Sequence, residues 1–383
     1  MNQKSLKTVE LFAGVGGFRV AAEQKGLETV WANDIDSTAV TVYKDNFGDN
    51  SIVLGDIHDY IDSIPDHDIL TGGFPCQPFS KAGKKQGIAD YRGTLFEVIV
   101  NILEKRRPRY FVLENVNSLL YMDNGKHFRT ILSALSSLGY KIEWRVLNAV
   151  SFGLAQHRER VIIVGAKDVA FNDSFFIEHE DVDCISTETL DSIARFSRWK
   201  DIEQSREKFK TWGMALNGMF VSADVTERQY HPKVILNDII EENPPASFDF
   251  TEDTLERIKS SQYVNKFYNG VQILYNQAGG ARMGYSIFGT EGTSPTLTAS
   301  TSRHYERYKV GDRFRRLTNV EYARLQGFSD THCNATSPYN QYKLYGNAVP
   351  PQIIAHAFDR ILENKLYRIE KQTFDIFDFG EEM

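Results

Sequence analysis

The sequence predicts an α/β fold, a doubly wound and mainly parallel sheet joined to a smaller, irregular region of strands and loops. Short apolar stretches alternate with amphipathic helical patterns over the first 165 residues, as in parallel sheets whose strands are connected by helices. The alternation breaks after residue 167, and turns such as Asn243-Pro-Pro245 replace it up to residue 310. We therefore expect a first domain at residues 1–180, a second at 181–312, and a return to the first at 313–383.

The expected strands of the first domain are short and apolar. The first, at residues 7–12, runs into the glycine turn Ala13-Gly-Val-Gly-Gly17 and then into a helix pattern from Phe18 to Lys25. Further strands are expected at residues 29–36, 51–54, 66–70, 109–113, 141–146 and 160–164. Apolar residues at helical spacing predict helices from about residue 37, at 95–103 and at 128–138.

Polar or reactive residues stand at the carboxyl ends of the strands: Gly14, Asp34, Asp56, Cys76 and Glu114. In doubly wound sheets ligands bind beyond these ends, so we expect one shared site. A glycine turn before a helix N-terminus can hold a nucleotide or cofactor, although its spacing here is not the dinucleotide pattern. A carboxylate after the second strand could hold ribose hydroxyls. The alternative is that Asp34 or Asp36 caps the helix beginning near Ser37.

The last part of the chain is expected to return to the first domain. Residues 316–327 show a helical pattern. The stretch Tyr345-Gly-Asn-Ala-Val-Pro-Pro351, with its glycine and two prolines, interrupts the helical pattern before a last helix. A final helix carries Ile353, Ile354, Ala357, Phe358, Ile361 and Leu362 on one face. Such an apolar stripe needs a sheet to cover, and the first domain offers one.

Composition excludes several classes of protein. Of the 383 residues, 42% are hydrophobic and 25% charged, as in soluble globular proteins. No run of eighteen apolar residues predicts a membrane-spanning helix, and the first residues carry no apolar secretory stretch. The three cysteines, Cys76, Cys184 and Cys333, are too few and scattered for a disulfide scaffold or a zinc cluster. We expect a cytoplasmic protein with no membrane partner and no metal, and a monomer.

The net charge of −7 argues mildly against a nucleic-acid partner. The charge is unevenly distributed, however. Residues 299–316 hold six basic and two acidic side chains, and Lys81, Lys84, Lys85 and Arg92 follow Cys76. A local basic face on an acidic protein is therefore expected to remain available for nucleic acid.

Cys76 lies in the turn Gly73-Phe-Pro-Cys-Gln-Pro-Phe-Ser80, where Pro75 stiffens the chain. A lone cysteine is more often a small buried hydrophobic residue. If the substrate is a pyrimidine, a thiolate that adds to C6 makes C5 nucleophilic toward an electrophilic methyl group. That chemistry also needs a carboxyl group at N3, a cation and a cradle for the methyl donor. Glu114, Arg158 or Arg160, and the Gly14–Gly17 turn meet these needs.

The remaining motifs extend this pattern over nearly the whole chain. They are Phe12-Ala-Gly-Val-Gly-Gly17, Asn33-Asp-Ile-Asp36, Gly55-Asp-Ile57, the Cys76 turn, Glu114-Asn-Val116, Gln156-His-Arg-Glu-Arg160, Arg316-Leu-Thr-Asn-Val-Glu-Tyr-Ala-Arg-Leu-Gln-Gly-Phe328 and Gly346-Asn-Ala-Val-Pro350. In this order they closely resemble the DNA (cytosine-5)-methyltransferase family of the bacterial restriction–modification type. The resemblance implies the S-adenosylmethionine-dependent methyltransferase fold, S-adenosylmethionine as cofactor, and a second domain that recognises a specific short sequence of double-stranded DNA.

The resemblance also implies roles for single residues. Cys76 would attack C6 of cytosine, Glu114 would contact N3 and the exocyclic amine, and Arg158 and Arg160 would orient the cysteine, the base and its phosphate. A surface salt bridge is the alternative for the two arginines. The cofactor would be bound by Phe12, Gly14, Val15, Asp34, Ile35, Asp56, Ile57, Pro75, Leu95, Asn347 and Val349, with Asp34 on the ribose and Asp56 on the adenine amine. Simple core packing is the alternative for Leu95.

DNA contacts are implied for Gln77, Ser80, Lys81, Thr296, Leu297, Arg303 and His304. The target base would have to leave the duplex to reach a thiol in a pocket. Ala82 stands where some relatives carry a serine, which leaves open the side chain that fills the vacated stack. Ile35 replaces the aromatic residue that often stacks on adenine, so slightly weaker cofactor binding is expected.

Three other functions compete with this one. An RNA methyltransferase of the same fold could act on a cytosine in tRNA, but Gln77 and a recognition region of over a hundred residues favour DNA. A nicotinamide oxidoreductase would share the half-fold from Gly14 to Asp34. This sequence, however, lacks the third glycine position and a His or Lys arrangement for hydride transfer, which argues against that function. A catalytically silent DNA-binding relative conflicts with the presence of Cys76, Glu114 and both arginines.

Overall fold

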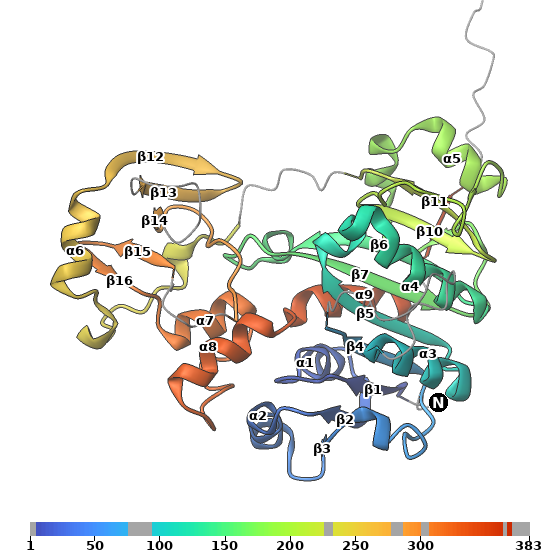
Figure 1. Cartoon of the computed structure of the whole chain (residues 1–383), viewed down its shortest axis with the longest axis horizontal. Coiled ribbons are helices and arrows are strands. Elements are labelled where there is room, and N and C mark those ends of the chain that lie inside the picture. The colour runs from blue at the N-terminus through green and yellow to red at the C-terminus, as the bar shows by residue number, and fades with distance from the viewer. Residues whose placement is uncertain are drawn as a thin grey trace, which may run out of the picture.

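The computed structural model describes residues 5–75, 94–225, 233–276, 286–299, 306–362 and 366–369. Within these residues, ten strands form a large sheet and five form a smaller one, set apart from each other in Figure 1. A third pairing joins β8 (Asp173–Ser174) to β17 (Tyr367–Arg368). The predicted α/β class is confirmed, with the two sheets as the cores of two regions.

Half of the large sheet is parallel. Its strands lie in the order β3-β2-β1-β4-β5, and each pairs in parallel with its neighbour. Their bounds are Val53–Leu54, Glu28–Asp34, Lys7–Leu11, Ile69–Gly73 and Tyr110–Val116, respectively. Most residues of β1, β4 and β5 are buried, as expected for strands covered on both faces. All five carboxyl ends therefore meet at one edge.

The other half of the large sheet is antiparallel and reaches further along the chain than the sequence predicted. β5 pairs with β7 (Glu159–Ala166), and β7 with β6 (Lys141–Asn148). Beyond β6 follow β10 (Trp212–Leu216), β11 (Met219–Ala223) and β9 (Lys200–Asp201).

This pairing changes the expected domain boundary. Residues 200–223 belong to the large sheet, although the sequence analysis placed them in the second domain. Antiparallel strands need only short connections, so the alternation of strand and helix stops at residue 167 while the sheet continues. We propose that the division lies after Ala223.

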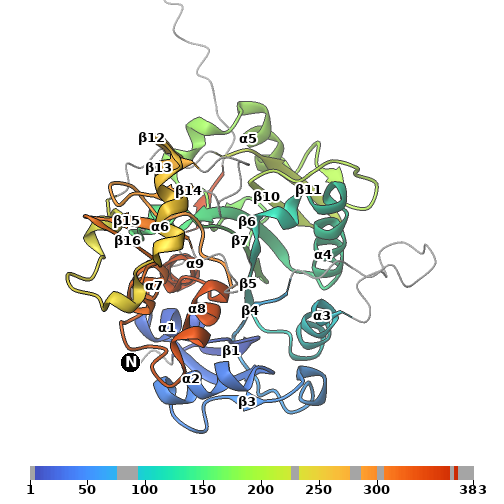
Figure 2. The same cartoon turned by 60° about the vertical axis from the view of Figure 1, so that its left-hand side comes forward.

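Helices cover both faces of the large sheet (Figure 2). On one face, α1 (Gly17–Gln24) and α9 (Pro351–Leu362) pack side by side in one hydrophobic cluster. On the other lie α3 (Leu95–Arg106) and α4 (Lys126–Ser137). The prediction that the last helix covers the first domain's sheet is confirmed. Two further helices are α2 (Ser37–Phe47) and α5 (Thr187–Ala194).

The smaller sheet has the order β12-β13-β14-β15-β16. Its strands are Gln262–Tyr268, Val271–Asn276, Ser286–Phe288, Arg307–Val310 and Arg313–Arg315, and α6 (Glu252–Lys259) accompanies them. Short 3-10 turns occur at Ile57–Asp59, Asn117–Leu120, Met122–Gly125, Ala149–Phe152, His179–Cys184, Leu236–Asp238 and Ala246–Phe248.

Two helices, α7 (Asn319–Gln326) and α8 (Pro338–Asn347), lie between the two sheets and lead the chain back to the first (Figure 1). The sequence predicted α7 at residues 316–327. It begins three residues later because Thr318 and Glu321 form a capping box. It ends at Gln326, and the residue that caps it, Gly327, has a φ of 78° that suits glycine.

Candidate functional site

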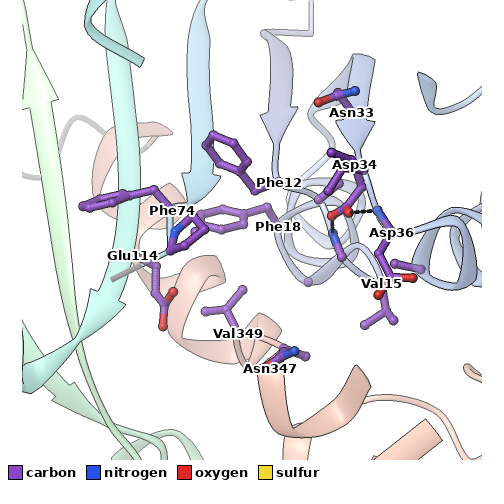
Figure 3. A pocket seen from close by; sticks show the side chains of 18 of the residues that line it. Phe12, Val15, Phe18, Asn33, Asp34, Asp36, Phe74, Glu114, Asn347 and Val349 are labelled. Carbon is purple, nitrogen blue, oxygen red and sulfur yellow. Dashed lines mark hydrogen bonds between the residues drawn. The ribbon is translucent and has the colours of Figure 1, made fainter. Parts of the chain in front are cut away.

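A cavity of about 490 Å³ lies at the carboxyl edge of the parallel strands. Its walls come from the ends of β1, β2, β4 and β5, the start of α1, and the segment that joins α8 to α9. Figure 3 shows Glu114 toward one end of this cavity and Asp34 and Asp36 toward the other, with Asn347 and Val349 along one wall. The volume is in the range of small-molecule sites.

The glycine turn after β1 has a backbone that few side chains tolerate. Gly14 and Gly16 have φ of 55° and 86°, and Phe12 also has a positive φ of 55°. A positive φ strains a bulky residue such as phenylalanine, and such strain is concentrated at binding sites. At Gly17 a Cβ atom would stand 2.5 Å from the carbonyl oxygen of Val349. Only glycine therefore lets the start of α1 touch the segment before α9.

Asp34 and Asp36, which the sequence could not tell apart, have different tasks. Asp36 caps α2, since its Oδ1 accepts the Thr38 N–H at 2.9 Å. Asp34 accepts the backbone N–H groups of Gly14 at 2.7 Å and Asp36 at 2.8 Å. Burial raises the pKa of the Asp34 carboxyl, and the two N–H groups oppose that rise. Asp34 thus ties the glycine turn to β2 and faces the cavity.

Asp56 and Ile35 form the more open part of the cavity wall. Asp56 caps the 3-10 turn at Ile57–Asp59 by accepting the His58 N–H at 3.0 Å. Its Oδ1 also lies 2.6 Å from His58 Nδ1. The side chain of Ile35 is 71% exposed, whereas Ile57 is buried. An apolar side chain left open beside a carboxylate suits the flat ring of a purine, which has apolar faces and an amine at its edge.

Glu114 lies near the carboxyl end of β5 and forms an ion pair with Arg160, whose Nε lies 2.8 Å from Glu114 Oε1. Burial raises the pKa of the Glu114 carboxyl, although the charges of Arg160 and Arg158 work against this rise. A Cβ atom on Gly73 would lie 3.1 Å from Glu114 Oε2, so the glycine leaves room for the carboxyl group. A raised pKa favours a carboxyl group that can donate a proton.

The turn before Cys76 is held by Asn115, to which the sequence analysis gave no role of its own. Asn115 Nδ2 donates to the carbonyl oxygen of Phe74 at 2.8 Å, and its Oδ1 accepts the Val116 N–H at 2.9 Å. The ring of Phe74 packs against Phe96, with 5.5 Å between centroids. Pro75, the next residue, lines the cavity. The end of β4 is thus fixed up to the residue that precedes Cys76.

The structure brings together most of the residues that the sequence singled out. Every predicted cofactor residue lines the cavity, together with Glu114 and Arg160. Leu95 packs against the core and also lines the cavity, and its contact with a cofactor stays a prediction. Sequence reasoning missed the roles of Phe18, Phe74, Leu344 and Gly346 as lining residues. Their position within or beside the quoted motifs was the available signal. Cys76, Gln77, Ser80, Lys81, Arg303 and His304 lie outside the described residues.

Arg158 is placed differently from the prediction. Its side chain is fully buried and is not among the residues that line the cavity. The guanidinium donates to three backbone carbonyl oxygens, those of Leu297, Gly346 and Ala348. The alternative of a surface salt bridge does not fit this burial. The role of Arg158 toward Cys76 and the base stays a prediction, because Cys76 lies outside the described residues.

The predicted DNA contact of the Leu297 side chain also needs correction, whereas the contact of Thr296 stays a prediction. Leu297 is 1% exposed and packs in a hydrophobic cluster with Tyr308, so its side chain cannot reach a duplex. The Thr296 hydroxyl donates to the carbonyl oxygen of His157 at 2.6 Å. Both residues anchor the segment that leads to Arg303 and His304 in the sequence.

Neither a metal cluster nor a membrane-spanning helix occurs in the described part of the chain. No group of three or more His, Cys, Asp or Glu side chains there could hold a metal ion. None of the helices described is long and apolar enough to cross a membrane.

Comparisons with known proteins agree with one another. A family model described as C-5 cytosine-specific DNA methylase matches residues 6–363. Type II methyltransferase M.HaeII of Haemophilus aegyptius is 36% identical over 92% of this chain and 91% of its own. Type II methyltransferase M1.ScrFI of Lactococcus lactis subsp. cremoris is 33% identical over 93% of this chain and 78% of its own length. The crystal structure of the S. pombe Dnmt2 methyltransferase has the same fold, with a TM-score of 0.63, 19% identity, and 94% and 99% of the two chains covered.

Proposed function

The chain belongs to the C-5 cytosine-specific DNA methylase family and is a DNA cytosine-5 methyltransferase, and from this premise we propose its reaction in detail. It transfers a methyl group from S-adenosylmethionine to C5 of a cytosine in a short, specific duplex sequence. The names of its type II relatives support a role in protecting host DNA within a restriction–modification system.

The cavity fits S-adenosylmethionine in size and in the chemistry of its walls. Asp34 would hold the ribose and Asp56 the adenine amine, while Ile35 and Ile57 would offer apolar contact to the ring; all four residues line the cavity. When bound there, the cofactor supplies a methyl group on a sulfonium, which is electrophilic. The segment at Asn347–Val349 closes the cavity against the glycine turn.

The protein's own residues prepare the cytosine for the transfer. The Cys76 thiolate forms a bond from Sγ to C6, and the electron pair of the C5–C6 double bond moves into the ring. Glu114, oriented by Arg160, donates a proton to N3 and so offsets the negative charge. C5 would then be nucleophilic and would take the methyl group, while the methyl–sulfur bond of the donor breaks and leaves a neutral thioether. Loss of the C5 proton to water, departure of the Cys76 thiolate and return of the N3 proton to Glu114 would restore the double bond and the neutral base.

The observation that carries this proposal is the convergence of two sets of residues on one cavity. The glycine turn, Asp34 and Asp56 form one set, and the Glu114–Arg160 pair with Pro75 forms the other. Because the cavity lies at a sheet edge lined by side chains, a cytosine stacked in a duplex cannot enter it. The target base must therefore flip out of the helix.

Bisulfite sequencing of a plasmid from cells that express the chain tests the proposed function. We expect cytosines protected from conversion in one short repeated context. The Cys76→Ala variant should give a fully converted plasmid while still binding DNA. Full conversion with the native chain would overturn the proposal. A radiolabel assay that compares duplex DNA with tRNA would then show whether the alternative RNA substrate is used.

A further inference from the structure

Arg158 lies where two segments from distant parts of the chain meet. The first is residues 294–299, the described part of the segment leading to Arg303 and His304; we call it the recognition stem. The second is residues 346–349, which line the cavity; we call it the closing segment. Arg158 Nη1 donates to the Leu297 carbonyl at 3.0 Å, and Nη2 donates to the carbonyls of Gly346 at 3.0 Å and Ala348 at 2.9 Å. One guanidinium thus holds both segments.

The two segments also touch each other directly. A Cβ atom on Gly346 would stand 2.4 Å from the carbonyl oxygen of Thr298 and 2.6 Å from the backbone nitrogen of Ala299. Gly346 lines the cavity on its other side. A single glycine therefore both lines the cavity and packs against the backbone of the recognition stem.

The residues before Arg158 fasten the recognition stem along its length. The His157 N–H donates to the Ser294 carbonyl at 2.8 Å, and the Thr296 hydroxyl donates back to the His157 carbonyl. Gln156 Oε1 accepts the Leu297 N–H at 2.9 Å. These bonds hold the stem to the start of β7. The bonds of Arg158 extend this attachment to the closing segment.

We propose, on the basis of the proposed function, that Arg158 is a positioning residue that couples cofactor binding to DNA binding. A cofactor that orders the closing segment also orders the recognition stem through the shared guanidinium, and DNA acts in the reverse direction. Its charge makes these bonds stronger than neutral ones. Because the guanidinium is fully buried, a carbonyl that moves away leaves an N–H without a partner or water, which is costly.

The test measures the affinity of S-adenosylhomocysteine, a non-reacting analogue, with and without a duplex. The duplex carries the site found by bisulfite sequencing, and calorimetry gives both dissociation constants. In the native enzyme we expect the duplex to tighten analogue binding at least about five-fold, the lower end of typical coupling. In Arg158→Lys the ratio should fall to within about two-fold of one, because an ammonium cannot match the planar fork of a guanidinium.

Arg360→Lys is the matched control. Arg360 also donates to backbone carbonyls, those of Phe175 and Ile177, but on α9 far from the recognition stem in sequence and contacts. This variant should keep the native ratio. A native ratio of one, or an unchanged ratio in Arg158→Lys, would overturn the proposal even if methyl transfer is lost. Because methylation by the native chain is measured separately, failure of the coupling is distinguishable from failure of the proposed function.

Hydrogen exchange keeps the proposal testable if Arg158→Lys does not fold. In the native enzyme, the analogue alone should slow exchange several-fold at the amides of Ser294 and Leu297. Both are bonded inside the protein, to Ala155 and Gln156, and neither residue lines the cavity. Unchanged exchange at both amides upon saturation with the analogue would contradict the coupling.

Discussion

Strands β5 and β12 have seven residues each but lie in opposite surroundings. β5 lies inside the large sheet between β4 and β7, and its Phe111, Val112 and Leu113 are fully buried. β12 forms the edge of the smaller sheet, where Tyr263, Phe267 and Tyr268 are 59%, 56% and 69% exposed. The first strand positions Glu114 through packing on both faces. The second strand, β12, exposes its aromatic side chains to solvent.

The difference in burial between β5 and β12 indicates where the protein can tolerate substitutions. A side chain near the end of β5 is held in position by two neighbouring strands and by helices on both faces of the sheet. The smaller sheet has fewer such constraints, and its edge can change sequence without disturbing the cavity. The wall of the cavity and the edge of the smaller sheet thus differ in burial, and the proposed recognition of DNA would fall to the more exposed of the two.

The largest effect should come from Glu114→Gln at the end of β5. An amide cannot donate a proton to N3 in place of the carboxyl, so we expect kcat to fall by about 10²–10⁴-fold. The amide retains the shape that fits beside Gly73 but leaves the largely buried Arg160 charge without its ion-pair partner, so a loss of thermal stability is also expected. Single-turnover methyl transfer to the cognate duplex checks the rate. An unchanged kcat would remove Glu114 from the mechanism.

Phe111→Ala tests the packing of β5 itself. Phe111 is fully buried and its ring meets that of Tyr140 at 5.1 Å between centroids. Removal of a buried phenylalanine side chain typically costs about 3–5 kcal/mol in the free energy of unfolding. Denaturant unfolding measures the loss. A cost below about 1 kcal/mol would mean that this part of the sheet is less tightly packed than its burial indicates.

The large sheet also buries a carboxyl group, which gives a pH dependence. Burial raises the pKa of Glu10 to about 8, although the Tyr43 hydroxyl donates a hydrogen bond to it. In the unfolded chain the pKa of this carboxyl is about 4.3. Between the unfolded pKa and the folded pKa of about 8, the folded state therefore holds a proton that the unfolded state has lost. The stability contributed by this group is complete below the lower value and is lost as pH rises toward 8.

Glu10→Gln should remove this dependence. Relative to the native protein, the variant should gain about 1.4 kcal/mol in free energy of unfolding per pH unit between about pH 5 and 8. Unfolding curves at three pH values within that window measure the difference. Parallel curves for the two proteins would show that Glu10 is ionised in the folded state.

The smallest effect is expected on β12. Phe267→Ala changes the same residue type as Phe111→Ala, but at an exposed edge, and should alter the free energy of unfolding by no more than about 0.5 kcal/mol. Binding of the cognate duplex is the second measurement for this variant. A stability loss comparable to that of Phe111→Ala would erase the contrast between the two strands.

The sequence allowed the parallel half of the fold and its site to be predicted because their signals are local. A strand end, a glycine turn and a helix start lie within a few residues of each other, and all carboxyl ends of parallel strands share one edge. Local patterns alone were therefore enough to assign Asp34, Asp56 and Glu114 to one cavity.

The errors concern contacts between distant residues. β10 joins the sheet through β6, which lies far before it in the chain, and nothing local marks that pairing. The carbonyl partners of Arg158 lie 139, 188 and 190 residues away. Every residue has a backbone carbonyl, so the residue types in the sequence do not predict which arginine will bind to these three carbonyls. The burial of Leu297 was hidden for the same reason.

The contact between Gly17 and Val349 determines when the cavity can form during synthesis of the chain. These residues stand near opposite ends of the described chain, yet both line the cavity. During synthesis the first strands can pair soon after they leave the ribosome. The cavity cannot close until residue 349 has emerged, long after the smaller sheet. An incomplete chain therefore lacks part of the cavity wall, and the cavity is completed only after the residues of the smaller sheet have been synthesised.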